Sequence, residues 1–311
     1  MLGCKKMKSD LRMLSPKDIF HYNSQKSHNV NHHMPELPEV ETILRGLIPQ
    51  LEGATIQDVI IRHPQLRWPI PTELKALLSQ QKILSLSRRG KYLLIHVSTG
   101  TLIIHLGMSG SLRLLTLDVP LTRHDHVDII LSPHQRLRYN DPRRFGAILW
   151  TEENPLNHPL LKSMGIEPLD MNFTGQYLKQ KALNRHAAIK PFIMNSKIVT
   201  GIGNIYAAEA LFLAKIHPTM PAGLLTQQQC DQLVEAIKQI LKSAISQGGT
   251  TLKDFVNSEG KPGYFAQKLH VYGRANLPCS TCGAPLRSIQ LGQRSTVFCE
   301  HCQPPANDSL G

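Results

Sequence analysis

Residues 82–97 read KILSLSRRGKYLLIHV, in which two largely apolar runs flank the polar turn Arg89-Gly90. Runs of this length, rich in Leu and Ile and interrupted by a turn with glycine, are typical of two strands. Similar runs occupy residues 55–62, 102–108, 111–115, 127–132, 136–139 and 146–150. Because so many consecutive strands separated by Gly, Pro and polar turns favour an antiparallel arrangement, the N-terminal part is predicted to be a β-sandwich or barrel-like sheet.

Helical periodicity dominates beyond residue 152. Helices are expected near 177–183, 187–194, 204–215 and 226–247, and one more at 37–50, ahead of the strands. The clearest is the one ending near residue 247, where apolar residues recur every three or four positions. Thr226 is its expected cap and Gly248-Gly249 its expected stop. The sequence thus predicts an α+β, two-domain protein with the β-sandwich first and the helical domain second.

Changes of pattern along the chain set the domain boundaries. A segment rich in Pro and Asn separates the two halves, and closely spaced cysteines mark the C-terminal part. The predicted organisation is a leader (1–34), a β-sandwich domain (35–152), a linker (153–168), a helical domain (169–270), a zinc-binding module (271–303) and a tail (304–311).

The chain of 311 residues carries a formal net charge of +12. Its first 34 residues hold six Lys or Arg against two Asp and so supply +4, which leaves +8 for the rest. Such a surplus favours an anionic polymer, nucleic acid first, because released counterions drive the binding. An ordinary basic enzyme is the alternative. No run approaches the roughly 20 apolar residues of a membrane span, so a soluble, cytoplasmic protein is expected.

Four of the six cysteines form two Cys-x-x-Cys pairs. They are Cys279, Cys282, Cys299 and Cys302. This is the ligand number and spacing of a zinc ribbon, and four thiolates leave no open coordination position, so one structural Zn²⁺ is predicted. A redox dithiol or a chance spacing is the alternative. Residues 291–298, between the pairs, are expected to form a hairpin with Arg294 at its tip, suited to contacts with DNA.

Met34-Pro35-Glu36 would place a proline at the start of the chain if translation began at Met34 and this methionine were removed. The ring nitrogen would then be a secondary amine with a pKa near ~8, able to attack a carbonyl carbon at neutral pH. The leader has no apolar core for a secretory signal, and its acids argue against a transit peptide. A mis-set start is the favoured interpretation. A genuine disordered tail is the alternative, and it would leave Pro35 an internal amide.

Residues 200–206 form a glycine-rich turn before a helix, where backbone amides could hold a phosphate of DNA. The turn lacks the third glycine of a dinucleotide fingerprint, so no nucleotide cofactor is expected. A plain turn between helices is the alternative. Residues 88–91 place three cations on a turn between strands, a common surface feature.

A further turn, residues 141–146, sets Phe145 beside Arg143. An exposed apolar wedge next to a guanidinium can open a base step and fill the space of an extruded nucleotide. Met108, at the end of a predicted strand, could add a flexible apolar side chain, although a methionine there is more often part of the core.

Taken together, these motifs resemble bacterial formamidopyrimidine-DNA glycosylase, a bifunctional base-excision repair enzyme, from Pro35 to about Gln303. The matching motifs are PELPEVET from Pro35, RRGKYL from Arg88, HLGMSG from His105, HDHV from His124, DPRRFG from Asp141, GIGNIY from Gly201, GGTTLKDF from Gly248, GKPGYF from Gly260 and the terminal zinc finger. The related endonuclease VIII branch shares the Pro-Glu start but not its continuation. The resemblance implies a helix-two-turn-helix layout in the helical domain.

The resemblance also implies the chemistry. Pro35 would attack the sugar C1′ of the damaged nucleotide, and Glu36 would act as the acid-base group. The resulting iminium acidifies the neighbouring sugar proton, so β- and then δ-elimination can cleave the strand. Lys91 and Arg294 are assigned to this catalytic machinery, and Glu39 would support the amine, unless it is simply a first-turn acid favoured by the helix dipole. The expected substrate is double-stranded DNA with 8-oxoguanine or formamidopyrimidines.

Other residues are matched to DNA contacts by the same resemblance. Phosphate contacts are implied for Lys91, His126, Arg143, Asn204 and Arg294. Met108, Arg143 and Phe145 would fill the vacated stack, with Arg143 facing the orphaned cytosine. Residues 250–267, which include Tyr264, would close over the flipped base. Lys190 would lie near the lesion pocket, and the DNA would lie in a positive cleft between the domains.

Three alternatives remain open at this point. An endonuclease VIII type of glycosylase would prefer oxidised pyrimidines. A non-catalytic binder of damaged DNA would result if the leader persisted on Pro35. An unrelated zinc-dependent hydrolase is disfavoured because four cysteines saturate the metal. The expected state is a monomer that acts on the nucleoid.

Overall fold

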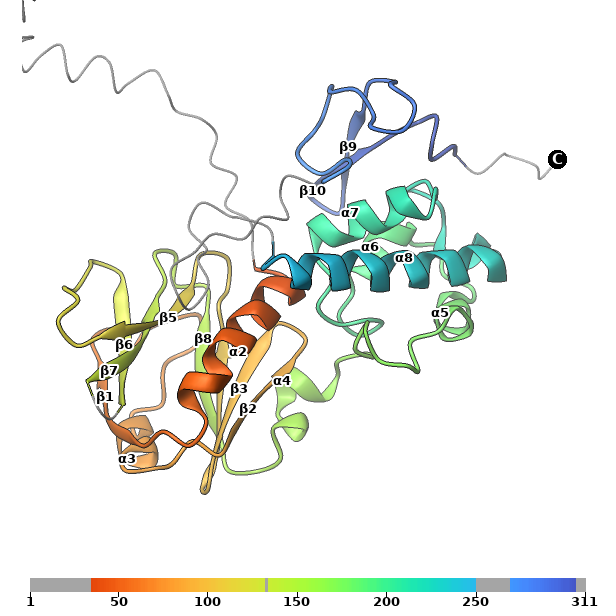
Figure 1. Ribbon diagram of the computed structural model, residues 1–311. Coiled ribbons are helices and arrows are strands. Elements are labelled where there is room, and N and C mark those ends of the chain that lie inside the picture. Colours follow the sequence, from red (N-terminus) through yellow and green to blue (C-terminus); the bar gives the residue numbers. More distant parts are fainter. Residues whose placement is uncertain (1–34, 132–133, 250–268, 306–311) are drawn as a thin grey trace, which may run out of the picture. The chain divides into compact units, whose positions relative to one another are not determined.

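Two four-stranded antiparallel sheets make up the N-terminal domain (Figure 1). This computed structural model describes residues 35–131, 134–249 and 269–305. The sheet with the order β1-β6-β7-β5 consists of β1 (Ile56–Ile61), β5 (Ser111–Thr116), β6 (Asp125–Leu131) and β7 (Gln135–Asn140). The sheet with the order β2-β3-β4-β8 consists of β2 (Ser85–Arg89), β3 (Tyr92–Val97), β4 (Gly100–His105) and β8 (Ala147–Thr151). The predicted antiparallel sandwich is confirmed.

The main core lies between these sheets. Because side chains alternate across a strand, β6 turns Val127, Ile129 and Leu131 into this core. Helix α2 (Leu37–Leu51), expected from its periodicity, packs its apolar face into the same core and runs beside β2 and β3 (Figure 1). A short helix that the sequence did not suggest, α3 (Leu74–Leu78), adds two buried leucines.

Strand β3 is buried on both faces, which explains its continuous apolar run. Leu93 and Ile95 point into the main core, whereas Leu94 packs against Leu161 in a smaller cluster. Leu161 belongs to the predicted linker, which therefore packs on the sandwich. The linker contains η1 (Pro155–Asn157) and α4 (Pro159–Lys162).

The C-terminal domain is helical and has a separate core. Its elements are α5 (Gly175–Ala182), α6 (Ile189–Ile193), α7 (Asn204–Leu213), η2 (Ala222–Leu224) and α8 (Gln227–Ser246). Helix α7 is buried nearly all round, while α8 packs its apolar stripe against α5 and α7. None of the helices in the described ranges is long and apolar enough to cross a membrane.

The ends of α8 confirm the predicted cap and stop. The Thr226 hydroxyl accepts the Gln229 amide at 3.2 Å, and the Gln229 side chain accepts the Thr226 amide at 2.9 Å. This reciprocal pair satisfies two amides that the first turn leaves open. After Ser246, Gly248 and Gly249 adopt positive φ values of 76° and 80°, which glycine tolerates without strain.

The C-terminal hairpin is formed by β9 (Arg287–Leu291) and β10 (Arg294–Phe298). Gly292 and Gln293, both with positive φ, make the turn. Arg294 is therefore the first residue after the turn, paired with Leu291, rather than the tip itself. Its side chain is exposed, as predicted.

Candidate active site

The start of α2 is buried against the start of α7. Pro35 is buried, and Glu36 is 3% exposed. The Glu36 carboxylate accepts the amides of Gly203 at 2.7 Å and Ile205 at 2.9 Å. The Glu36 amide in turn donates to the Glu39 carboxylate at 3.0 Å. Because unpaired amides and the helix dipole make the start of α7 positive, this carboxylate is held in one place.

The glycines of residues 200–206 make this contact possible. A Cβ at Gly203 would lie 2.3 Å from the Glu36 carboxyl carbon, and one at Gly201 would lie 2.6 Å from Leu37. The Gly201 carbonyl also accepts the Leu37 amide at 3.1 Å. The amides of Gly203 and Ile205, two of those considered for a DNA phosphate, are thus occupied by the protein's own carboxylate, and the phosphate interpretation is wrong for these two.

Burial and charge set the protonation of this pocket. Burial raises the pKa of Glu36 above its usual value, and the positive charge of Lys91 opposes the rise. Burial lowers the pKa of Lys91, although Glu36 and Glu39 act against it. Glu36 therefore retains its proton to higher pH, and Lys91 loses its proton more easily. Both shifts suit the two groups to proton transfer.

Lys190 joins α6 to α7 and to the hairpin. Its ammonium donates to the Asn204 side chain at 2.6 Å, the Thr296 hydroxyl at 2.8 Å and the Ser295 carbonyl at 3.4 Å. Lys190 is 1% exposed, and burial lowers its pKa to about 8. The Asn204 amide group also donates to the Ser295 carbonyl. Lys190 therefore lies among residues of the site, but its hydrogen bonds hold Arg294's strand in place.

Two side chains near the site were not among the sequence predictions. His105 has its pKa lowered to about 4, by burial and then by Lys91 and Arg67, so it is neutral. Its Nδ1 accepts the Gly107 amide at 2.9 Å, which leaves the proton on Nε2. Tyr272 has its pKa raised to about 12 by burial and by the charge of Glu36. The motif HLGMSG could have pointed to His105; no sequence pattern pointed to Tyr272.

The three side chains expected to fill the DNA stack lie on two turns. Phe145 is 45% exposed, and the Arg143 guanidinium lies 4.7 Å from the centre of its ring. Met108 is half-buried rather than part of the core. The exposed aromatic ring, next to a guanidinium, is available for insertion into a base stack.

Two of the predicted DNA contacts cannot be placed at a surface. His126 is 4% exposed, and its Nε2 donates to the Asp141 carbonyl at 2.8 Å. His124, two residues earlier, is half-exposed. Tyr264 and residues 250–267 lie outside the described residues, so the loop predicted to close over the base stays a prediction.

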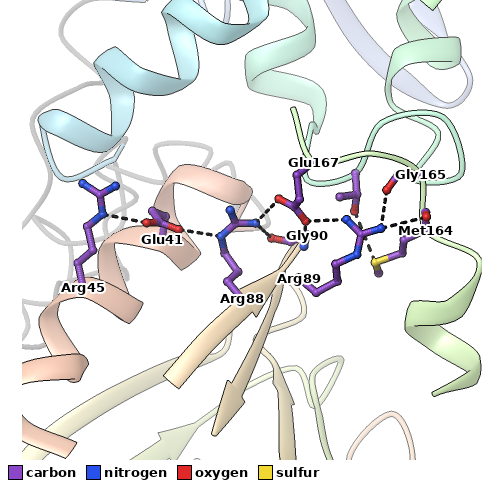
Figure 2. A network of polar contacts seen from close by, with 9 residues as sticks. Glu41, Arg45, Arg88, Arg89, Gly90, Met164, Gly165 and Glu167 are labelled. Atoms are coloured by element: carbon purple, nitrogen blue, oxygen red, sulfur yellow. Dashed lines mark hydrogen bonds and ion pairs between the residues drawn. The ribbon is translucent and has the colours of Figure 1, made fainter. Parts of the chain in front are cut away.

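Arg88 and Arg89 bind acids of the protein itself, although the sequence suggested surface cations (Figure 2). The Glu167 carboxylate accepts Arg88 at 2.8 Å, Arg89 at 2.9 Å and the Gly90 amide at 2.7 Å. Arg88 also binds Glu41 of α2 at 2.9 Å. Since Lys91 follows Gly90, this network holds the turn that carries the lysine.

Glu167→Gln should loosen the turn of Gly90 and Lys91. One charge and one of the two acceptor oxygens would be lost beside two partly buried arginines, so we expect a loss of about 2 kcal/mol in the free energy of unfolding. Calorimetry would measure the loss, and the rate of strand cleavage should fall with it. Glu153→Gln, a change to an exposed acid at the start of the predicted linker, should change neither quantity. A Glu167→Gln protein with unchanged stability and rate would contradict the role of this network.

The four predicted zinc ligands are the final component. Their sulfur atoms lie within 4.8 Å of one another, with Cys279 and Cys302 3.8 Å apart and Cys282 and Cys299 3.5 Å apart. Four sulfurs at the Zn–S bond length of about 2.3 Å around a tetrahedral ion would be about 3.8 Å apart. The donor set therefore fits one structural Zn²⁺ and is too widely spaced for disulfides.

Family comparisons agree with this geometry over most of the chain. Residues 34–148 match the formamidopyrimidine-DNA glycosylase N-terminal domain, residues 164–256 match its H2TH domain, and residues 276–305 match the zinc finger found in FPG and IleRS. The chain belongs to the formamidopyrimidine-DNA glycosylase family.

Similar family members come from several bacteria. The formamidopyrimidine-DNA glycosylase of Marinobacter nauticus is 53% identical over 270 residues, which are 87% of this chain and 100% of that protein. The Lactococcus lactis Fpg in complex with abasic-site DNA has a TM-score of 0.81 at 36% identity, covering 86% of this chain and 99% of that one. A structure of MutM with DNA containing carbocyclic 8-oxo-G has a TM-score of 0.79 at 36% identity, covering 87% and 100%.

In this family member, zinc removal should disable the hairpin selectively. Because the four thiolates stabilise a module with few buried apolar residues, metal loss should unfold residues 276–305 while the sandwich stays folded. We expect about one zinc per chain by metal analysis, and a fall in duplex affinity of roughly tenfold or more after chelation, since Arg294 loses its position. Cys299→Ser should behave alike, whereas Cys230→Ser should keep its zinc. Undiminished duplex binding without zinc would contradict this role.

Proposed function

We propose that this chain excises oxidised purines from double-stranded DNA and then cleaves the abasic strand by β- and δ-elimination. The observation that carries the proposal is the placement of Glu36: a buried carboxylate next to Pro35, fixed by the amides of α7 and influenced by Lys91. The Lactococcus relative described above was solved with abasic-site DNA, and MutM with an 8-oxo-G analogue. Both complexes support the same substrate class.

The chemistry requires that Pro35 be the first residue. Its nitrogen lone pair then bonds to C1′, and the damaged base leaves with the electrons of the glycosidic bond. Glu36 transfers protons during opening of the sugar ring. The proline nitrogen then loses its own proton, and its lone pair breaks the C1′–O4′ bond to give an iminium while O4′ takes a proton from Glu36. The iminium acidifies the proton on C2′, whose removal expels the 3′ phosphate, and removal of the C4′ proton then expels the 5′ phosphate. Lys91 and Arg294 are proposed to assist these steps as cations beside the phosphates.

The DNA contacts follow from exposure and charge. Arg294 and Asn204 are proposed to bind phosphates, held in position by Lys190 and the hairpin. For the histidine contact we favour His124 over the predicted His126, because His126 is buried and hydrogen-bonded to the backbone. A protein that acts on chromosomal DNA would work at the nucleoid.

Arg143→Ala should weaken discrimination of the opposite base. Its guanidinium, exposed above the Phe145 ring, is free to hydrogen-bond an orphaned cytosine, and each such pair discriminates by about 1–3 kcal/mol. We therefore expect the preference for cytosine over adenine opposite 8-oxoguanine to fall by roughly tenfold or more. Single-turnover excision on the two duplexes measures it. Arg144→Ala is the matched control on the same turn, and an unchanged preference in Arg143→Ala would remove Arg143 from this role.

The substrate class is tested by comparing two lesions. The protein, expressed from its own gene with native upstream sequence, is given duplexes with 8-oxoguanine opposite cytosine or with thymine glycol. Faster cleavage of 8-oxoguanine supports the proposal, and faster cleavage of thymine glycol would indicate an endonuclease VIII type of activity instead. Lesion binding without any cleavage would indicate a non-catalytic binder.

A further inference from the structure

Asp141 lies buried, fully removed from solvent, immediately after β7. One carboxylate oxygen accepts the Ser109 hydroxyl at 2.7 Å and the Arg143 amide at 3.2 Å. The other accepts the Gly146 amide at 2.9 Å and the Tyr139 hydroxyl at 3.3 Å. All four donors are neutral, and they converge on one side chain from two different turns and, for Tyr139, from β7.

These two turns carry the side chains expected to fill the DNA stack. Ser109 follows Met108, while Arg143 and Gly146 enclose Phe145. One carboxylate thus binds both turns. One oxygen joins the two turns directly, because it accepts both the Ser109 hydroxyl and the Arg143 amide, and the other oxygen holds the far end of the second turn through the Gly146 amide.

Close packing leaves the turns little freedom to adjust without Asp141. A Cβ at Gly107 would lie 2.5 Å from the Gly146 nitrogen, and one at Gly146 would lie 1.7 Å from the Tyr139 hydroxyl oxygen. The Asp141 carbonyl is also engaged, since it accepts Nε2 of His126. Burial and the Asp141 charge raise the pKa of Tyr139 well above its usual value, so its hydroxyl remains a donor.

We infer that Asp141 is a positioning residue that holds Met108, Arg143 and Phe145 as one rigid unit for insertion into the base stack. The inference rests on the proposed function. Insertion requires the three side chains to be in register before the DNA arrives, because ordering them afterwards would cost binding free energy. Asp141 itself reaches no DNA, since it is buried, and acts only through the two turns.

Asp141→Asn is the decisive variant. Asparagine keeps one acceptor oxygen, and its NH₂ group would face two donors, so either Ser109 and Arg143 or Gly146 and Tyr139 lose their acceptor. Excision of 8-oxoguanine needs the base to be extruded and replaced. Cleavage at a preformed abasic site does not need base extrusion. We expect excision to fall by about 30-fold or more and abasic cleavage by less than about threefold, as for a misplacement of the inserting groups.

Asp125→Asn is the matched control. Asp125 is a buried carboxylate in the neighbouring strand β6, and it accepts the Thr122 amide at 2.7 Å and the Asn140 side chain at 2.8 Å, neither on the two turns. The same substitution there should lower stability without changing the ratio of the two activities. Fluorescence of 2-aminopurine beside the lesion adds a direct readout, since insertion unstacks it; Asp141→Asn should lose this increase and Asp125→Asn should keep it.

The outcomes separate the possibilities. An unchanged activity ratio and an unchanged fluorescence signal in Asp141→Asn would overturn the inference and leave Asp141 a structural brace. If Asp141→Asn fails to fold, Ser109→Ala decides instead. It removes the hydroxyl that donates to Asp141 and accepts the Arg143 amide, and a ratio shifted by less than about twofold would overturn the inference. If the wild-type protein cleaves neither the 8-oxoguanine duplex nor the abasic-site duplex, the proposed function fails, and this failure is independent of the role of Asp141.

Discussion

A chain that begins at Pro35 will form a borohydride-stable adduct with a duplex carrying 8-oxoguanine opposite cytosine, and the 311-residue chain with its leader retained will form none above background. A free secondary amine can attack C1′, whereas the amide nitrogen of an internal proline has no available lone pair. Loss of a nucleophile costs several orders of magnitude in rate, so we expect a difference of roughly 10³-fold or more. Gel mobility of the trapped complex and peptide mapping of the adduct would measure it.

A chain that begins at His33 is the control for this result. It adds only two residues before Pro35, so it blocks the amine without the bulk of the leader. It should bind the lesion duplex as well as the chain that begins at Pro35 and should form no adduct. An adduct of equal yield from the His33 chain would show that another amine is the nucleophile and would remove Pro35 from the mechanism.

Glu36→Gln should abolish base excision almost as completely. Its carboxyl belongs to the residue next to Pro35 and combines a fixed position with a raised pKa. An amide cannot exchange protons, and loss of a general acid-base group costs about 10²–10⁴ in rate. Single-turnover excision of 8-oxoguanine would measure the loss. Glu52→Gln, just beyond the far end of the same helix, should excise at the wild-type rate.

The pH dependence follows from the direction of the shift at Glu36. Because burial raises its folded pKa above the ordinary value, the protonated acid persists to higher pH than in a free glutamate and is lost as pH rises through the raised pKa. Excision that uses this proton should therefore decline on the alkaline side, and Glu36→Gln should lack that decline. A Glu36→Gln rate within about threefold of wild type, with the same pH profile, would place the proton transfer elsewhere.

Features that depend on residues close together in the chain could be predicted from the sequence. The apolar runs between turns predicted the strands, and the turn expected at Arg89-Gly90 lies one residue later, at Gly90 and Lys91. Thr226 marks the start of α8 and Gly248 follows its end, as expected, because caps and stops act on backbone groups only a few residues away. The spacing of the four cysteines predicted their cluster, since each pair needs only a tight turn to present two sulfurs.

The role of Gly201 and Gly203 could not be predicted from residues nearby in the chain. Gly201 and Gly203 were interpreted as a phosphate-binding turn, yet they are small because Leu37 and Glu36 approach them. Those partners are more than 160 positions away, and nothing in a local pattern reveals which side chain will fill a helix N-terminus. Arg88 and Arg89 were likewise interpreted as surface cations, but both bind Glu167, a residue more than 70 positions further along the chain.

The sequence by itself determined the order of the domains, most of the secondary structure, the zinc ligands and, through its motifs, the family. These depend on neighbours in the chain, so they can be read from spacing. Only the tertiary structure decided that Glu36 closes the start of α7, that Lys190 holds the hairpin, and that Asp141 binds two turns at once. Each is a contact between distant segments, and its protonation and strength arise from burial, which exists only after the chain has folded.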